Sequence, residues 1–72
     1  MSRQIARDRF RRIASSRSNR VLHNLELLMN CADRKNYDYD ETQVNEIFNT
    51  IESAVAQAKS KFNPKVRRRI RL

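Results

Sequence analysis

The sequence has no glycine and no tryptophan, and it has one proline and one cysteine among its 72 residues. Phosphate-binding loops of nucleotide enzymes need glycine, so this class of site is excluded. A single cysteine forms no internal disulfide, which favours a reducing compartment, and we expect a cytoplasmic protein. No run approaches the roughly 20 consecutive apolar residues of a transmembrane helix, and no apolar segment follows the basic start. We therefore expect neither a membrane span nor a secretory signal.

Side chains that support catalysis or metal binding are also scarce. His23 is the single histidine, so no Ser-His-acid triad can be assembled. His23 and Cys31 are too few ligands for a zinc site. A calcium loop starting at Asp38 would need glycine where Gln43 stands and a bidentate acid where Asn49 stands. We therefore expect no enzymatic activity, no cofactor and no metal site.

The formal net charge is +8, and the basic residues are concentrated at the two ends of the chain. Residues 1–20 contain seven arginines and one aspartate, and residues 59–72 contain seven basic residues and no acidic one. Residues 21–58 contain two basic and seven acidic residues. In the two end segments, arginines outnumber lysines by eleven to three. Because the planar guanidinium contacts phosphate through two parallel hydrogen bonds, this composition favours a nucleic-acid ligand.

A helix is predicted over residues 41–62. Asp40 is a good N-cap, and Gln43 stands where it completes a capping box. The helix is expected to end at the Asn-Pro pair of residues 63–64, because the residue before proline avoids the α region. Apolar residues recur at helical spacing along one face. They are Val44, Ile47, Phe48, Ile51, Ala54, Val55, Ala58 and Phe62.

A second helix is predicted over about residues 20–33, with Asn36 as a left-handed cap in place of the missing glycine. Upstream, residues 2–14 predict a short basic helix, followed by Ser15–Ser18 as a polar joint or a second N-cap. Because this joint contains neither proline nor glycine, one continuous helix over residues 3–33 is the competing prediction. The apolar face of the second helix comprises Val21, Leu22, Leu25, Leu28, Met29 and Ala32, with Leu27 and Cys31 beside it.

The expected fold class is all-α, with an antiparallel helical hairpin over residues 20–63 as the core. A basic helix or arm (1–19) precedes the hairpin and a basic tail (64–72) follows it. A short connection suits antiparallel neighbours, and this topology brings the two basic ends to one pole. A chain of this size builds a small core, and its apolar faces are wide, so we expect a homodimer in the form of a four-helix bundle.

Other residues have simpler interpretations. His23 is expected at the surface or an interface, and Cys31 is expected to pack as a small apolar residue rather than act as a reactive thiol. Tyr37 and Tyr39 are expected to pack at the hairpin tip rather than stack on bases, with Tyr39 and Val44 forming a hydrophobic staple. The tail 65–72 alternates basic and mostly apolar residues, which is typical of a strand, and a solvated arm is the alternative.

The middle of the chain carries a recognisable pattern. It consists of Asn30-Cys31, Asn36-Tyr37-x-Tyr39, Val44, Ile47-Phe48, Ile51-Glu52 and Lys59. The stretch that carries this pattern makes up just under half of the chain. In it, the chain resembles a family of small, mostly uncharacterised helical proteins of Gram-positive bacteria and their phages and plasmids. The resemblance implies a helical hairpin encoded on a mobile or accessory element, and it implies no settled activity.

The favoured function is therefore a small nucleic-acid-binding protein that holds phosphates with its arginine-rich ends. DNA is preferred over RNA because the resemblance points to mobile elements, where a DNA-binding regulator or accessory protein is expected. An alternative is a protein-interaction module that docks on a larger nucleoprotein machine such as a ribosome, a polymerase or a phage target. A third is organelle targeting, since residues 1–18 are rich in arginine and serine, but this leaves the basic tail unexplained. The candidate phosphate-binding residues are Arg3, Arg7, Arg11, Arg12, Arg17, Arg20, Lys61, Lys65, Arg67, Arg68, Arg69 and Arg71.

Overall fold

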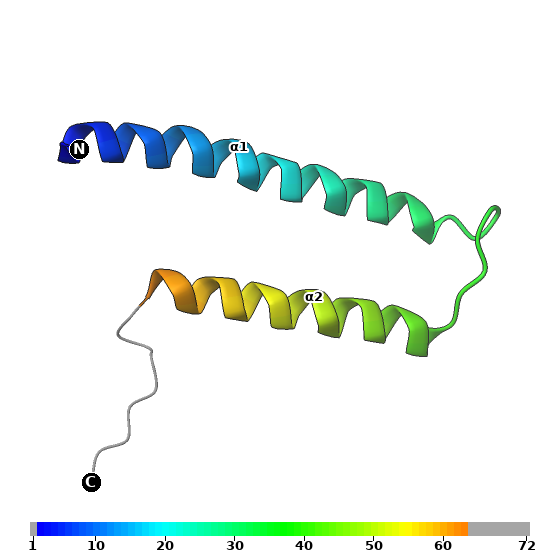
Figure 1. The fold of residues 1–72 in the computed structure, drawn as a ribbon. Coiled ribbons are helices and arrows are strands. Elements are labelled where there is room, and N and C mark those ends of the chain that lie inside the picture. Colours follow the sequence, from blue (N-terminus) through cyan, green and yellow to red (C-terminus); the bar gives the residue numbers. More distant parts are fainter. Residues whose placement is uncertain (1, 64–72) are drawn as a thin grey trace, which may run out of the picture. The chain divides into compact units, whose positions relative to one another are not determined.

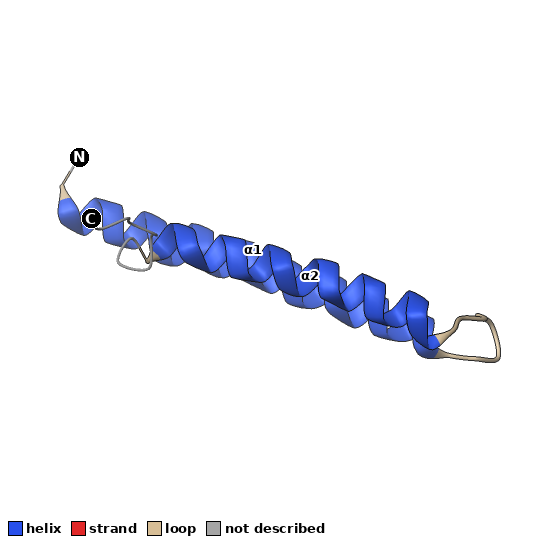
Figure 2. Cartoon of the chain, turned by 90° about the horizontal axis from the view of Figure 1, so that it is seen from below, coloured by secondary structure: helices blue, strands red, loops and turns tan. Residues whose placement is uncertain are grey.

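A computed structural model of the chain describes residues 2–63. It contains the α-helix α1 (Arg3–Met29), the short 3₁₀-helix η1 (Asn30–Ala32) and the α-helix α2 (Glu41–Phe62) (Figure 1). Residues 2–63 contain no strand, and Figure 2 shows only helices and loops there. The all-α class is therefore confirmed. The chain divides into two compact units between Asp38 and Tyr39, one built on α1 and the other on α2.

Helix α1 is continuous over 27 residues. Ser2 caps it, because its hydroxyl oxygen accepts a hydrogen bond from the backbone N–H of Ile5 at 3.1 Å. The helix then runs through Ser15–Ser18 without a break. The predicted separate helix over 2–14 is therefore wrong, and the competing helix over 3–33 is correct in its continuity, but the α-helix ends at Met29 and gives way to η1. Serine costs only a few tenths of a kcal/mol in a helix interior, and helix propagation is cooperative, so this stretch is too weak a signal to end α1. The predicted boundary between residues 19 and 20 lies inside α1.

The segment after α1 is organised by Asp33 rather than by Asn36. The Asp33 carboxylate accepts hydrogen bonds from the Lys35 backbone N–H at 3.0 Å and from the Asn36 side-chain amide at 2.9 Å. Its carbonyl oxygen accepts from the Asn36 N–H at 3.2 Å and the Tyr37 N–H at 3.0 Å. No residue in the described range 2–63 has a positive φ angle, so the predicted left-handed cap at Asn36 is wrong. Aspartate supplies the turn through its own side chain, which removes the need for a left-handed residue.

Helix α2 begins and ends where its sequence signals predict. Asp40 and Gln43 form the capping box, and Glu41 lies in the first turn, near the positive end of the helix dipole. The helix ends at Phe62, and Asn63 has left the helical conformation. Tyr39 and Val44 are both half-buried, as expected for the two positions of a hydrophobic staple.

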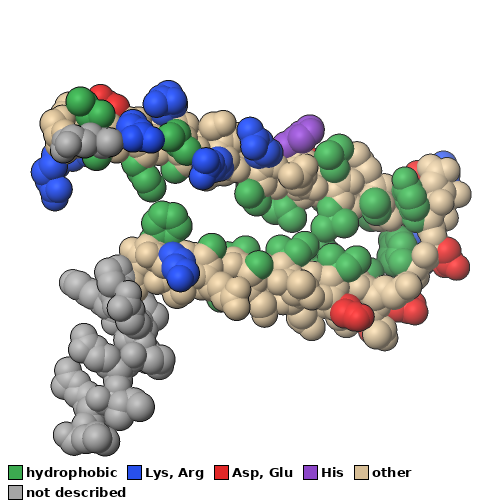
Figure 3. Space-filling view, viewed as in Figure 1, with side chains coloured by type: hydrophobic (Ala, Val, Ile, Leu, Met, Phe, Trp, Pro, Cys, Tyr) green, Lys and Arg blue, Asp and Glu red, His purple; other side chains and the backbone are tan. Residues whose placement is uncertain are grey.

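None of residues 2–63 is fully buried. The half-buried ones are Ile13, Ala14, Leu25 and Leu28 on α1, and Tyr39, Val44 and Ile51 in the second unit. Large apolar side chains on the predicted face of α2 stay exposed, with 43% of Phe48 and 74% of Phe62 accessible. Hydrophobic side chains gather along one side of α2 in Figure 3. Both units therefore leave large apolar side chains exposed.

Candidate nucleic-acid interface

All seven arginines of residues 1–20 lie on α1, and all are exposed. They are Arg3, Arg7, Arg9, Arg11, Arg12, Arg17 and Arg20. A helix rises 1.5 Å per residue, so their backbone positions are fixed along roughly 26 Å of one helix. The continuity of α1 thus turns an arginine-rich sequence into a rigid cationic surface.

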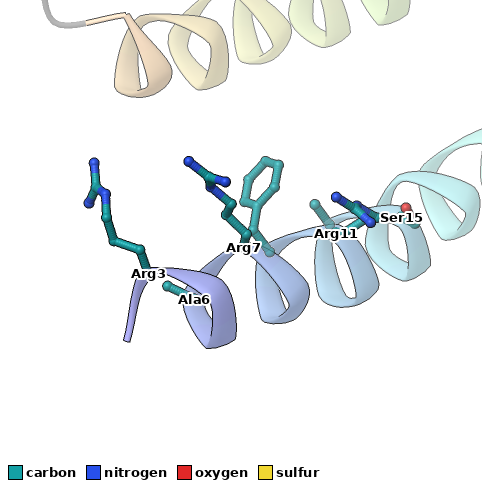
Figure 4. Close-up of a pocket in the computed structure, with 7 residues that line it drawn as sticks. Arg3, Ala6, Arg7, Arg11 and Ser15 are labelled. Atoms are coloured by element: carbon teal, nitrogen blue, oxygen red, sulfur yellow. The ribbon is translucent and has the colours of Figure 1, made fainter. Parts of the chain in front are cut away.

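Three of these arginines recur at every fourth position. Figure 4 shows Arg3, Arg7 and Arg11 in succession along the helix, with Arg3 and Arg7 projecting to the same side. With Ala6, Phe10, Ala14 and Ser15 they line a shallow hollow on the surface of α1. Alanine at positions 6 and 14 leaves open space on either side of Phe10, whose side chain is 60% exposed.

Three other arginines lie on a different side of α1. Counting 3.6 residues per turn, Arg9, Arg12 and Arg20 fall within one arc, roughly opposite the row formed by Arg3, Arg7 and Arg11. Arg17 belongs to neither row, since the same count places it between the directions of Ala6 and Phe10. Arg9 was absent from the predicted phosphate-binding set, although its position one turn before Arg12 is a sufficient signal to include it.

The arginine-rich part of α1 contains one acidic residue. Asp8 accepts a hydrogen bond at its Oδ1 from the Nε2 of Gln4 at 3.3 Å. The two residues are four positions apart, which places them on the same face of the helix. Their pairing orients the Gln4 amide and keeps its carbonyl oxygen pointing away from the carboxylate.

The second basic segment is only partly described. Lys61 and Lys59 are exposed in the last turn of α2, near the negative end of its dipole. Lys65, Arg67, Arg68, Arg69 and Arg71 lie outside the described residues, as does the strand-or-arm prediction for the tail.

For the single histidine, the single cysteine and the tyrosines, some of the predictions are confirmed and others are corrected. His23 is at the surface as predicted, with its Nδ1 3.7 Å from a carboxylate oxygen of Glu26 one turn away. Cys31, expected to pack as an apolar residue, is exposed in η1 instead. Tyr37, which was also expected to pack, is 51% exposed instead, whereas Tyr39 is half-buried.

Comparisons with protein-family models, curated proteins and solved structures found no match to this chain. The resemblance to small helical proteins of mobile elements therefore stays a prediction. Among residues 2–63, neither long helix is apolar enough to cross a membrane.

Proposed function

We propose that this protein binds nucleic acid, preferably DNA, by placing the arginines of α1 against backbone phosphates. The observation that carries the proposal is the set of seven exposed arginines on the first 18 residues of one continuous helix, with Asp8 as the only acid among them. Solubility alone does not require this density of one charge sign. The preference for DNA follows from the resemblance to proteins of mobile elements, where the chain would act as a regulator or accessory protein.

The proposal includes an assembly. Large apolar side chains of both α1 and α2 are exposed, and an apolar stripe on a helix is normally covered by another helix. We propose that the two helices pack as an antiparallel hairpin and that two hairpins form a four-helix bundle. The eight residues 33–40 between η1 and α2 suit such a connection. In this arrangement the arginines of α1 and Lys59 and Lys61 of α2 share one pole.

Salt-dependent binding tests the function. The dissociation constant of the full chain for a duplex DNA is measured by fluorescence anisotropy at a series of salt concentrations. Counterion release predicts a linear fall of log K with log salt, with a slope of about −0.9 for each phosphate neutralised. Binding without salt dependence, or no binding to DNA or RNA, contradicts the proposal.

A second candidate is a protein-interaction module, and the exposed apolar residues of α2 favour it. Ile47, Phe48 and Val55 are each at least 43% exposed, and a larger protein would cover them as well as a second copy would. Such a module would bind free DNA weakly and without a defined site size. A titration that shows a fixed number of nucleotides per protein therefore separates the two functions.

A further inference from the structure

We propose that residues 4–19 of α1 form a sequence-reading helix that lies in the major groove of duplex DNA. This inference rests on the proposed DNA binding and adds base recognition to it. It depends on the continuity of α1, because a joint at Ser15–Ser18 would leave the two ends of this segment without a common orientation.

The first observation is a polar strip between the two arginine rows. Counting 3.6 residues per turn, its members lie within about 60° of arc on α1. They are Gln4, Asp8, Ser15 and Asn19, and all four are exposed. Amide, carboxylate and hydroxyl groups are the side chains that read base edges: Gln and Asn pair with adenine, Asp accepts from cytosine, and Ser contacts either.

The second observation is where the arginines stand relative to this strip. Each arginine row is centred roughly 90° from the strip around the helix axis, and the two rows lie on opposite sides of the strip. One row is Arg3, Arg7 and Arg11, and the other is Arg9, Arg12 and Arg20. A helix lying on a flat anionic surface needs cations on one side only. A helix inside a groove has phosphates along both walls, so two flanking rows match this geometry.

The third observation concerns the side of α1 that faces away from the strip. Ala6, Phe10, Ile13 and Ala14 lie there together with the exposed Arg17, and Ile13 and Ala14 are half-buried. Further along α1, the apolar residues Val21, Leu25 and Leu28 lie between this side and the direction of the row Arg3, Arg7, Arg11. A reading helix needs such an apolar side, because the protein body must hold it from behind.

Asp8 separates this inference from simple phosphate binding. A carboxylate repels phosphates, so Asp8 contributes nothing to phosphate contact itself. Asp8 nevertheless lies within the polar strip, and the hydrogen bond from Gln4 holds it there. An acceptor at this position is explained if it faces the amino group of a cytosine.

The dimensions favour duplex DNA over duplex RNA. A helix with its side chains is about 10–12 Å across, and the major groove of B-DNA is about 12 Å wide. The major groove of A-form RNA is deep and too narrow for protein side chains to read.

The test is a selection of binding sites from a random duplex DNA library with the full chain. We expect one motif to be enriched, and the chain to bind it at least about tenfold more tightly than a shuffled duplex, which is the discrimination of a single good base contact. The triple variant Gln4→Ala, Ser15→Ala, Asn19→Ala should bind both duplexes alike, with the salt dependence of the parent. Because alanine favours helix, circular dichroism should show α1 intact.

The matched control exchanges the same three residue types on α2, at Gln57, Asn49 and Ser53, which are also exposed. This control should show the same difference in affinity between the selected and the shuffled duplex as the parent does. Asp8→Ala should strengthen binding to the shuffled duplex, because a carboxylate that repels phosphates is removed. It should at the same time reduce the difference in affinity between the selected and the shuffled duplex. Arg7→Ala with Arg12→Ala should weaken binding to both duplexes equally.

The inference is overturned if salt-dependent DNA binding occurs without an enriched motif, or if the triple variant keeps the discrimination of the parent. A preference for duplex RNA or single strands of the selected sequence also overturns it. In each of these cases the proposed nucleic-acid binding stands. If the parent binds no nucleic acid at any salt concentration, the proposed function itself has failed.

Discussion

Asp40 and Gln43 each satisfy a backbone N–H of the other. The Gln43 N–H donates to Oδ1 of Asp40 at 2.8 Å, and the Asp40 N–H donates to Oε1 of Gln43 at 2.9 Å. This reciprocal pair sets the first residue of α2, because it occupies two of the donors that the first turn leaves without helical partners. Because the pair fixes where α2 begins, it also fixes the position of Val44, the first residue of the apolar stripe, in the first turn of the helix.

Removing the cap should weaken the fold measurably. We expect Asp40→Ala to lower the free energy of unfolding by about 1 kcal/mol, as the loss of an aspartate N-cap does. Urea denaturation followed by circular dichroism measures the change. Asp38→Ala removes the same charge two residues earlier, outside the capping box, and is the control. Equal losses in the two variants would show that charge, and not the cap, accounts for the effect.

Ile51 tests the proposed packing of the apolar stripe. It is half-buried in a single copy and lies on the stripe of α2. If the proposed partners cover it, Ile51→Ala should lower the free energy of unfolding by about 2–5 kcal/mol. Ser53→Ala, two residues along on another face, should change it little. A loss below about 1 kcal/mol for Ile51→Ala would mean that this face is not covered.

The oligomeric state is a separate prediction. Because no residue in the range 2–63 is fully buried, we expect the chain to be a dimer at concentrations in the micromolar range. Sedimentation equilibrium measures the mass directly. A monomeric mass combined with full helicity and a cooperative thermal transition would contradict the four-helix bundle.

The two basic segments should contribute to DNA binding in the same way. Replacing Arg3, Arg7 and Arg11 by alanine should weaken binding to unrelated duplexes equally and flatten the salt slope by roughly 0.9 for each phosphate that is no longer neutralised. The quadruple variant at Arg67, Arg68, Arg69 and Arg71 should act likewise. Arg34→Ala with Lys35→Ala is the control, since both lie outside the basic segments. Anisotropy titrations in which both arginine variants match the parent would refute phosphate binding by these residues.

The continuity of α1 can be tested at Ser16. Proline there removes a helical hydrogen bond and clashes with the preceding turn, at a cost of about 3 kcal/mol or more. Ser16→Pro should reduce the helical circular dichroism signal and the affinity for DNA, whereas Ser16→Ala should preserve both. An unchanged affinity of Ser16→Pro, together with a broken helix, would show that α1 does not act as one unit.

The sequence by itself determined α2. Asp40, Gln43 and the Asn-Pro pair at 63–64 are strong local signals, and the structure places the ends of α2 where they predict. It also determined the start of the first helix to within one residue, since α1 begins at Arg3 after its cap Ser2, and it determined the exposed position of His23. These features depend on residues within one helical turn of each other, so no distant contact is needed to specify them.

Only the three-dimensional structure decided that α1 is a single helix. The stretch Ser15–Ser18 has neither a strong helix preference nor a residue that breaks a helix, so its state depends on cooperative propagation from both sides. Local signals also pointed to Asn36 for the turn after α1, whereas the Asp33 carboxylate forms it. A helix over residues 2–14 alone would already align Arg3, Arg7 and Arg11. The continuity of α1 is what gives Ser15, Asn19 and Arg20 a fixed orientation relative to them.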